Sequence, residues 1–185
     1  METLIKGVII VDPQSPHHGK VRDVLIKESK IARIDVDMDS ASSMQIWDEP
    51  GSSLSVGWMD LQADFADPGQ EQKEGLASGA KAAQAGGFTH VVLNTGQEPS
   101  PDHKSETPYL CARAAVFDTV LLPMGSLSQR HEGNQLAELL DLAAAGAVAF
   151  SDDGPVNRTE LLRRAFEYTE ALAQPIMTCP LDLGL

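Results

Sequence analysis

The residues best suited to chemistry are four aspartates that lie at the ends of apolar runs or close to the carboxyl terminus: Asp60, Asp64, Asp152 and Asp182. Carboxylate oxygens gathered at strand ends are ligands for hard cations such as Mg²⁺ or Ca²⁺. The same oxygens also cap helices and accept hydrogen bonds from loops. We favour the structural role, because no neighbouring basic group and no second type of metal ligand supports a cation site.

Histidine and cysteine are sparse and poorly placed for a zinc site. The five histidines are His17, His18, His90, His103 and His131. None forms an H-x-H pair and none ends a predicted strand, so the sequence offers no pair of imidazoles for zinc. The two cysteines, Cys111 and Cys179, lie far apart and predict no disulfide framework, which fits a reducing cytosol.

Charge and hydropathy restrict the partners. The 27 acidic residues outnumber the 14 basic ones, and the net charge of −13 would repel the phosphates that dominate nucleic-acid affinity. The first twelve residues lack the basic head and long apolar run of a signal peptide. No apolar run approaches the roughly 20 residues of a membrane-spanning helix. We therefore expect a cytoplasmic protein that binds neither nucleic acid nor membrane.

The first third of the chain predicts a small β-rich module over residues 1–54. Its strand-like runs are Leu4 to Val11, Val21 to Lys27, Lys30 to Val36 and Met44 to Trp47. Glu28 and Ser29 separate the second and third runs and predict a tight turn.

From residue 55 strands and helices alternate. Strands are expected at 55–61, 89–93, 119–123, 147–151 and 175–179, and helices at 71–85, 107–116, 134–145 and 159–173. Four β-α units and a fifth strand make about half of a (β/α)8 barrel, which needs eight units. An open, doubly wound five-stranded sheet is the alternative, although no G-x-G-x-x-G motif follows any strand.

Four segments, in order, resemble the dihydroorotase family of cyclic amidohydrolases: VGWMDLQADFADPG at 56–69, GGFT at 86–89, FSDDG at 150–154 and DLGL at 182–185. The resemblance extends over the whole chain. It implies a (β/α)8 TIM barrel with a side β-sandwich, one or two zinc ions, and reversible ring closure of carbamoyl aspartate to dihydroorotate in pyrimidine synthesis. Residues 1–54 would then belong to the side sandwich and residues 55–185 to the amino-terminal half of the barrel.

The chain departs from the family where its first barrel strand ends. The family pattern is D-x-H-x-H-F-R-D-P-G, and this chain has Gln62, Asp64 and Ala66 in place of the two histidines and the arginine. Side chains two apart on a strand point the same way, so Gln62 and Asp64 are expected to face the barrel mouth. An amide oxygen is a poor substitute for imidazole on zinc. Ala66 removes a guanidinium that would hold a substrate carboxylate.

Three further residues take their expected roles from the same resemblance. Asp152 matches the aspartate that bridges the metals, and Asn94 matches an asparagine that contacts the substrate. Cys179 stands where the family has a histidine ligand. A thiolate at Cys179 could bind zinc, but alone it cannot rebuild the site.

We therefore predict a dihydroorotase-like protein without activity and without a cofactor, which serves as a structural partner of aspartate transcarbamoylase or associates with itself through unpaired strand edges. The alternative is an active, zinc-dependent hydrolase of cyclic amides whose rebuilt site uses Asp64, Asp152 and Cys179 with residues outside this chain. Either possibility is compatible with the sequence being part of a longer protein.

Overall fold

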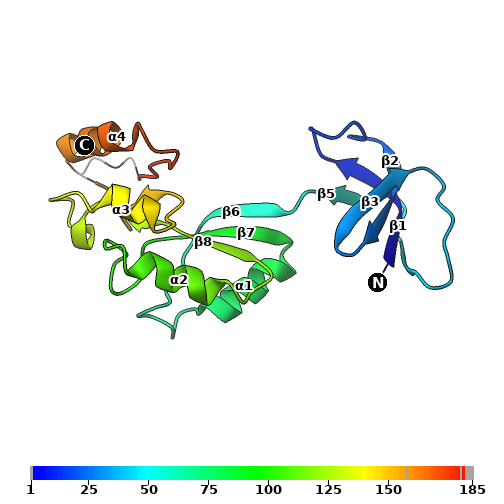
Figure 1. The fold of residues 1–185 in the computed structure, drawn as a ribbon, viewed down its shortest axis with the longest axis horizontal. Helices are drawn as coiled ribbons and strands as arrows, with labels where there is room; N and C mark the ends of the chain where they lie inside the picture. The colour runs from blue at the N-terminus through cyan, green and yellow to red at the C-terminus, as the bar shows by residue number, and fades with distance from the viewer. Residues whose placement is uncertain (1, 157, 180, 182–185) are drawn as a thin grey trace. The chain divides into compact units, whose positions relative to one another are not determined.

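The computed structural model describes residues 2–156, 158–179 and 181 and forms two compact units, Met1–Val56 and Gly57–Leu185 (Figure 1). The division after Val56 lies close to the predicted one after residue 54. Within the described part of the chain, no helix combines the length and the apolar character needed to cross a membrane.

The first unit is built on one five-stranded sheet. Its strands are β1 (Glu2–Val11), β2 (Val21–Lys27), β3 (Lys30–Asp35), β4 (Gln45–Asp48) and β5 (Ser53–Ser55). β1 pairs antiparallel with β2 on one side and parallel with β4 and then β5 on the other, and β3 lies outside β2. The tight turn predicted at Glu28 and Ser29 is present, with φ angles of 49° and 61°, the left-handed pair of a two-residue hairpin.

A buried carboxylate organises this sheet around a small apolar core of Val8, Ile10 and Val24. Asp23 is 5% exposed and accepts hydrogen bonds from the backbone N–H groups of Gly7 and Met38, each at 2.9 Å. Gly7 lies in the β1 bulge with φ +66°. Asp23 therefore satisfies buried donors that the strand ladder leaves unpaired.

The second unit alternates strands and helices. Its strands are β6 (Trp58–Ala63), β7 (Phe88–Leu93), β8 (Val120–Pro123), β9 (Gly125–Ser126) and β10 (Phe150–Ser151). Its helices are α1 (Leu76–Ala85), α2 (Glu106–Ala114), α3 (Leu139–Ala144) and α4 (Thr159–Thr169), with a 3₁₀ turn, η1, at Gln129–His131.

The strands of this unit are parallel and lie in chain order. β6 pairs with β7 and β7 with β8, while β9, which follows β8 directly, pairs with β10. Phe150 of β10 in turn forms a parallel bridge with Ile176. A doubly wound sheet places its first strand in the interior, whereas a barrel adds each strand beside the last. The observed order therefore counts against the doubly wound alternative.

Two helices begin later than predicted. The first was expected from residue 71 but begins at Leu76, after Gly75 in an extended conformation. The third was expected from residue 134 but begins at Leu139, because Leu136 forms a bridge with Ser128. Backbone pairing with the preceding loop at Ser128 thus replaces the first helical turn, and periodicity alone does not reveal such pairing.

The ends of the chain's last elements also differ from expectation. The fourth helix ends at Thr169, short of residue 173. The fifth strand, expected at 175–179, is reduced to the bridge at Ile176 and to backbone hydrogen bonds with Phe150.

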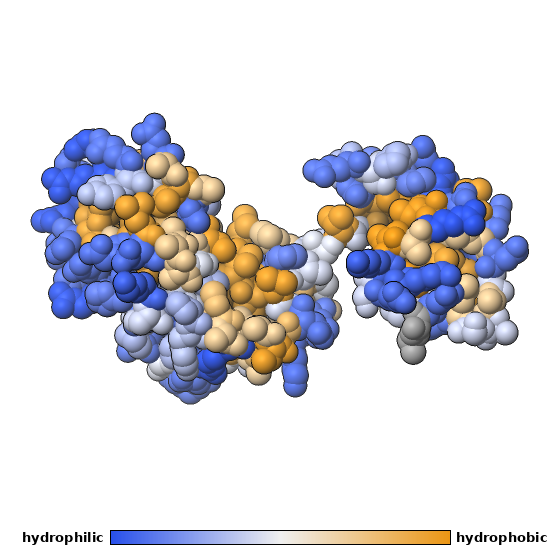
Figure 2. Space-filling view, viewed as in Figure 1, coloured by the Kyte–Doolittle hydropathy of each residue, from blue (hydrophilic) through white to orange (hydrophobic). Residues whose placement is uncertain are grey.

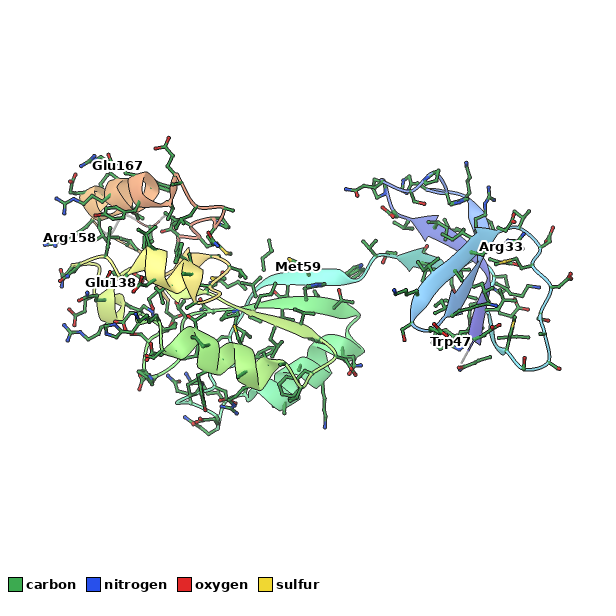
Figure 3. All side chains as sticks on the ribbon, viewed as in Figure 1. Arg33, Trp47, Met59, Glu138, Arg158 and Glu167 are labelled. Carbon is green, nitrogen blue, oxygen red and sulfur yellow. The ribbon has the colours of Figure 1, made fainter. Side chains whose placement is uncertain are left out.

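Both faces of the second unit's strands carry apolar residues, as parallel strands usually do. One face packs against α1 and α2 through a cluster of Leu76, Ala80, Val91, Leu93, Leu110, Ala114 and Leu121. The other face buries Val92, Met124 and Ala149. On β6, Met59 and Leu61 remain 48% and 60% exposed. Figure 2 shows hydrophobic surface over this region, and Figure 3 shows Met59 projecting away from α1 and α2.

Candidate functional site

The carboxyl ends of β6, β7 and β10 bring polar side chains to one edge of the second unit, which we call the mouth. Its residues are Gln62, Asp64, Asn94, Asp152 and Asp153. Parallel strands place their carboxyl ends together, which is why loops distant in sequence meet there.

A chain of amide and carboxylate groups crosses the mouth. Gln62 Nε2 lies 3.4 Å from Asn94 Oδ1, a long donor contact, and Asn94 Nδ2 donates to Asp153 Oδ1 at 2.7 Å. The backbone N–H of Asn94 also donates to Ala63 O at 2.9 Å. Asn94 is 7% exposed, so its side chain is fixed between its two neighbours. The structure thus brings together Gln62 and Asn94, two of the residues singled out in the sequence.

Asp64 faces the same space. A Cβ atom on Gly96 would lie 3.4 Å from Asp64 Oδ1 and 3.4 Å from Asp153 Oδ2. The two carboxylates therefore approach one another across Gly96. The loop that carries Asp64 is fixed by Phe65, whose ring lies 2.6 Å from where a Cβ on Gly79 of α1 would be. Only glycine at position 79 leaves room for that ring.

Asp152 is committed to the loop that follows β9. Its Oδ1 accepts hydrogen bonds from the backbone N–H groups of Leu127 and Ser128 at 3.0 and 2.9 Å, and its Oδ2 accepts from Ser128 Oγ at 2.6 Å. The residue is 8% exposed. Both carboxylate oxygens of Asp152 thus accept hydrogen bonds from buried donors. The residue to which the family resemblance assigns a metal-bridging role therefore has a structural role here.

The residue that sequence reasoning missed at the mouth is Asp153. It is exposed and contacts Asn94, whereas its neighbour Asp152 turns toward Leu127. The signal available in the sequence is the second aspartate of FSDDG, because adjacent side chains in an extended segment point in opposite directions.

The remaining predicted residues lie apart from this group. Asp60 Oδ1 accepts from the Gln62 N–H at 3.0 Å, a local contact within β6. Cys179 is exposed and its thiol is free of any disulfide. Ala66 is buried and left-handed, with φ 52°. Asp182, together with the rest of the DLGL segment, lies outside the described residues.

The described residues do not fit a zinc ion. Zinc requires about four nitrogen, sulfur or carboxylate ligands around one point. Across residues 2–156, 158–179 and 181, no three His, Cys, Asp or Glu side chains come together in a group that could hold a metal ion. The mouth offers the amides of Gln62 and Asn94 and the carboxylates of Asp64 and Asp153, while Asp152 is occupied by protein donors.

A cleft of about 540 Å³ adjoins the mouth. Its lining residues include Gly96, Gln97, Glu98, Asp102, His103, Arg130, His131 and Asp153. His131, which the sequence did not associate with a strand end, enters this cleft from η1, and its Nε2 lies 2.8 Å from Ser126 Oγ. Ser126 has no exposed surface, so this pair joins η1 to β9 and offers no accessible nucleophile.

Comparisons with known proteins agree with the sequence resemblance. The Dihydro-orotase-like family model matches residues 51–177. The chain is 37% identical over 187 residues to the dihydroorotase of Geobacter sulfurreducens and 38% identical over 188 residues to that of Syntrophus aciditrophicus. Each alignment covers 100% of this chain and 44% of the relative. The chain therefore spans less than half the length of these relatives.

Solved structures show the same fold at lower identity. The L-hydantoinase from Arthrobacter aurescens matches with a TM-score of 0.77 and 17% identity, covering 97% of this chain and 41% of the hydantoinase. A dihydroorotase crystal structure matches with a TM-score of 0.69 and 14% identity, covering 98% of this chain and 51% of that one. This chain therefore has an α/β fold that it shares with parts of these hydantoinase and dihydroorotase structures.

Proposed function

Since the chain belongs to the dihydroorotase-like family, we propose that it is a non-catalytic member linked to pyrimidine biosynthesis. The observation that carries the proposal is the use of Asp152. Its carboxylate accepts three hydrogen bonds from Leu127 and Ser128, and the two neighbouring histidine positions hold Gln62 and Asp64.

We infer that the second unit is the first four and a half units of a (β/α)8 barrel and that the first unit is part of the side β-sandwich. The chain-ordered parallel strands support this inference. In the described part of the chain β6 has a strand neighbour on one side only, and it exposes Met59 and Leu61. A further strand beside β6 would cover these residues, as barrel closure requires.

The chemistry of the mouth supports loss of hydrolysis. A hydrolytic zinc lowers the pKa of a bound water and needs ligands that leave one position open. The mouth instead presents amides and the carboxylates of Asp64 and Asp153. With Ala66 in place of arginine, no guanidinium from this position can pair with the carboxylate of dihydroorotate, and the two aspartates would repel it.

The proposed role is that of a structural partner of aspartate transcarbamoylase, with self-association as the competing outcome. The support is the family resemblance together with the apolar side chains that β6 exposes. Large apolar residues exposed along a strand edge favour association with another chain. We also place the protein in the cytoplasm, since Cys111 and Cys179 are both free thiols.

Two assays on the full chain test the proposal. Dihydroorotate hydrolysis with added zinc is compared with the Geobacter sulfurreducens dihydroorotase as a positive control. We expect no turnover above the uncatalysed rate. Turnover that depends on zinc would overturn the proposal in favour of a metal-dependent cyclic amide hydrolase, with Asp64, Asp152 and Cys179 as the ligands to mutate.

The partner is tested by sedimentation of the chain with the catalytic chain of aspartate transcarbamoylase from the same organism. A shared boundary at micromolar concentrations is expected. If the two proteins sediment in separate boundaries and this chain sediments as an oligomer, the role as a partner of aspartate transcarbamoylase is contradicted and self-association is supported.

A further inference from the structure

A second cleft, separate from Gln62, Asp64 and Asp152, lies between two loops and the start of α2. We call it the proline cleft. It has a volume of about 390 Å³, and its lining residues are Pro68, Gln97, Pro99, Pro101, Ser105, Glu106, Tyr109 and Leu110. Small-molecule sites of about 300–1,000 Å³ combine mostly apolar walls with a few polar groups, and the proline cleft has this character.

Gln97, which lines both this cleft and the mouth cleft, has one hydrogen-bond acceptor without a partner among the described residues. The residue is 6% exposed, and its Nε2 donates to the backbone oxygen of Asn94 at 2.6 Å. This bond fixes which end of the amide faces Asn94. Its Oε1 is buried and, among the described residues, has no hydrogen-bond partner. Because the great majority of buried polar atoms are paired, an orphan acceptor beside a cleft calls for a partner, which a ligand in the cleft can supply.

Glu106, which also lines this cleft, has a second acceptor without a partner in the described structure. Its Oε1 accepts a hydrogen bond from Ser105 Oγ at 2.7 Å. Its Oε2 is buried and has no partner within the described part of the chain. Two independent side chains, one an amide and one a carboxylate, thus line the same cleft with an unsatisfied oxygen each.

The cation that packs on Tyr109, a residue lining the cleft, is already paired with a carboxylate. Arg113 lies over the ring of Tyr109 at 5.6 Å, and its guanidinium makes two hydrogen bonds with the carboxylate of the buried Asp67. The charge of Arg113 is therefore already balanced by Asp67. The hydroxyl of Thr107, also unpaired within the described ranges, can donate only one hydrogen bond. A ligand can supply the remaining donors, and a positively charged one is favoured because one acceptor belongs to a carboxylate.

We propose that the proline cleft binds a small primary amine with an apolar body, whose ammonium group donates to Gln97 Oε1 and Glu106 Oε2. The prolines and Leu110 provide apolar contact for the body of the ligand. Neither oxygen has exposed surface, so the ligand reaches them after a small rotation of either side chain. This site lies outside the family's metal and substrate positions and does not depend on whether the protein is catalytic.

The test is a backbone-amide NMR titration of the full chain with cyclopentylammonium and, as a neutral isostere, cyclopentanol. We expect millimolar binding of the amine, with shifts confined to the loop at 97–101 and to the first turns of α2. The alcohol should bind about tenfold more weakly, since it lacks the charge and two of the donors.

Matched variants locate the site. Glu106→Gln keeps the size of the side chain and removes its charge, and it should weaken amine binding about tenfold. Glu98→Gln is the control, because Glu98 lines the mouth cleft and not the proline cleft. Gln97→Met removes the other acceptor at nearly constant length and replaces the first variant if Glu106→Gln does not fold.

Three outcomes would overturn the proposal. Equal binding of amine and alcohol would mean that the orphan oxygens contribute nothing. Shifts centred on Asp64 and Asp153, unchanged by Glu106→Gln, would indicate general attraction to the acidic mouth. If neither probe binds at millimolar concentrations, ordered water and not a ligand is the hydrogen-bond partner of the two oxygens.

Discussion

Asp64 and Asp152 stand at the same edge of the second unit, and the chain uses them in opposite ways. Asp152 is 8% exposed and satisfies three donors of the loop after β9. Asp64 is exposed, and its carboxylate accepts a local hydrogen bond from the Ala66 N–H at 3.0 Å. Asp152, to which the sequence resemblance assigns a ligand role, is the one whose carboxylate is used by the structure. A motif therefore assigns the position of a side chain, and its hydrogen bonds decide what that side chain can do.

The largest effect is expected at Asp152. Asp152→Ala leaves two backbone N–H groups and the hydroxyl of Ser128 without their acceptor, and it should lower the free energy of unfolding by about 3 kcal/mol. Urea denaturation followed by circular dichroism measures the change.

The adjacent aspartate is the matched control for this variant. Asp153→Ala removes one hydrogen bond to Asn94 and should cost about 1 kcal/mol. An equal or larger loss for Asp153→Ala would mean that Asp152 is not the structural member of the pair.

An intermediate effect is expected at the ion pair of Asp67 and Arg113, which joins the loop after β6 to α2. Asp67 is buried, and its Oδ2 accepts from Arg113 Nη2 at 2.9 Å and from the Leu76 N–H at 3.2 Å. Arg113→Met leaves the carboxylate without a cation. Because the arginine side chain is 40% exposed, water compensates in part, and we expect a loss of about 2 kcal/mol.

The salt dependence of the stability loss should distinguish the Asp67–Arg113 pair from the exposed ion pairs of α4. The same denaturation experiment on Arg163→Met, which removes exposed partners of Glu160 and Glu167, should show a much smaller change that high salt abolishes. A loss for Arg163→Met as large as that for Arg113→Met would contradict the distinction between buried and exposed pairs.

The two thiols offer a comparison by reactivity. Burial raises the pKa of the Cys111 thiol, whereas Cys179 is exposed. At neutral pH less Cys111 is present as the reactive thiolate, so iodoacetamide should modify it about tenfold more slowly than Cys179. Its rate should keep increasing at a pH where an ordinary thiol has already ionised.

Mass spectrometry of the two cysteine-containing peptides measures both rates. Added zinc should leave the rate at Cys179 unchanged. Protection of Cys179 by zinc would identify the thiolate as a ligand. It would contradict the conclusion that the described residues do not fit a zinc ion.

The smallest effect is expected at Asp64 itself. Asp64→Ala removes one local hydrogen bond from an exposed side chain and should change the free energy of unfolding by less than about 0.5 kcal/mol. A loss comparable with that of Asp152→Ala, measured in the same denaturant series, would show that the two aspartates share one structural role.

Much of the fold could be predicted from sequence periodicity, because apolar runs and turns mark most strands. The hairpin at Glu28 and Ser29 and the strand β2 are observed where they were predicted. The three-residue strand β5 was missed, since so short a segment has no measurable period. The late start of α3 was missed because Leu136 pairs with Ser128, a contact between loops.

The candidate site could be predicted only in part. Gln62, Asp64 and Asn94 lie together because strand ends of a parallel sheet meet. The role of Asp152 depends on backbone donors 24 and 25 residues away, which no local pattern reveals. The orphan oxygens of Gln97 and Glu106 likewise become visible only when hydrogen-bond partners can be assigned.

The measurement that tests the central claim most directly is the zinc content of the purified full chain after equilibration with zinc and removal of the free metal. The engaged carboxylate of Asp152 and the replaced histidine positions predict substoichiometric zinc that a chelator removes without changing the melting temperature. Stoichiometric zinc that raises the melting temperature, and that is lost in Asp152→Asn, would contradict the account and restore Asp152 as a metal ligand.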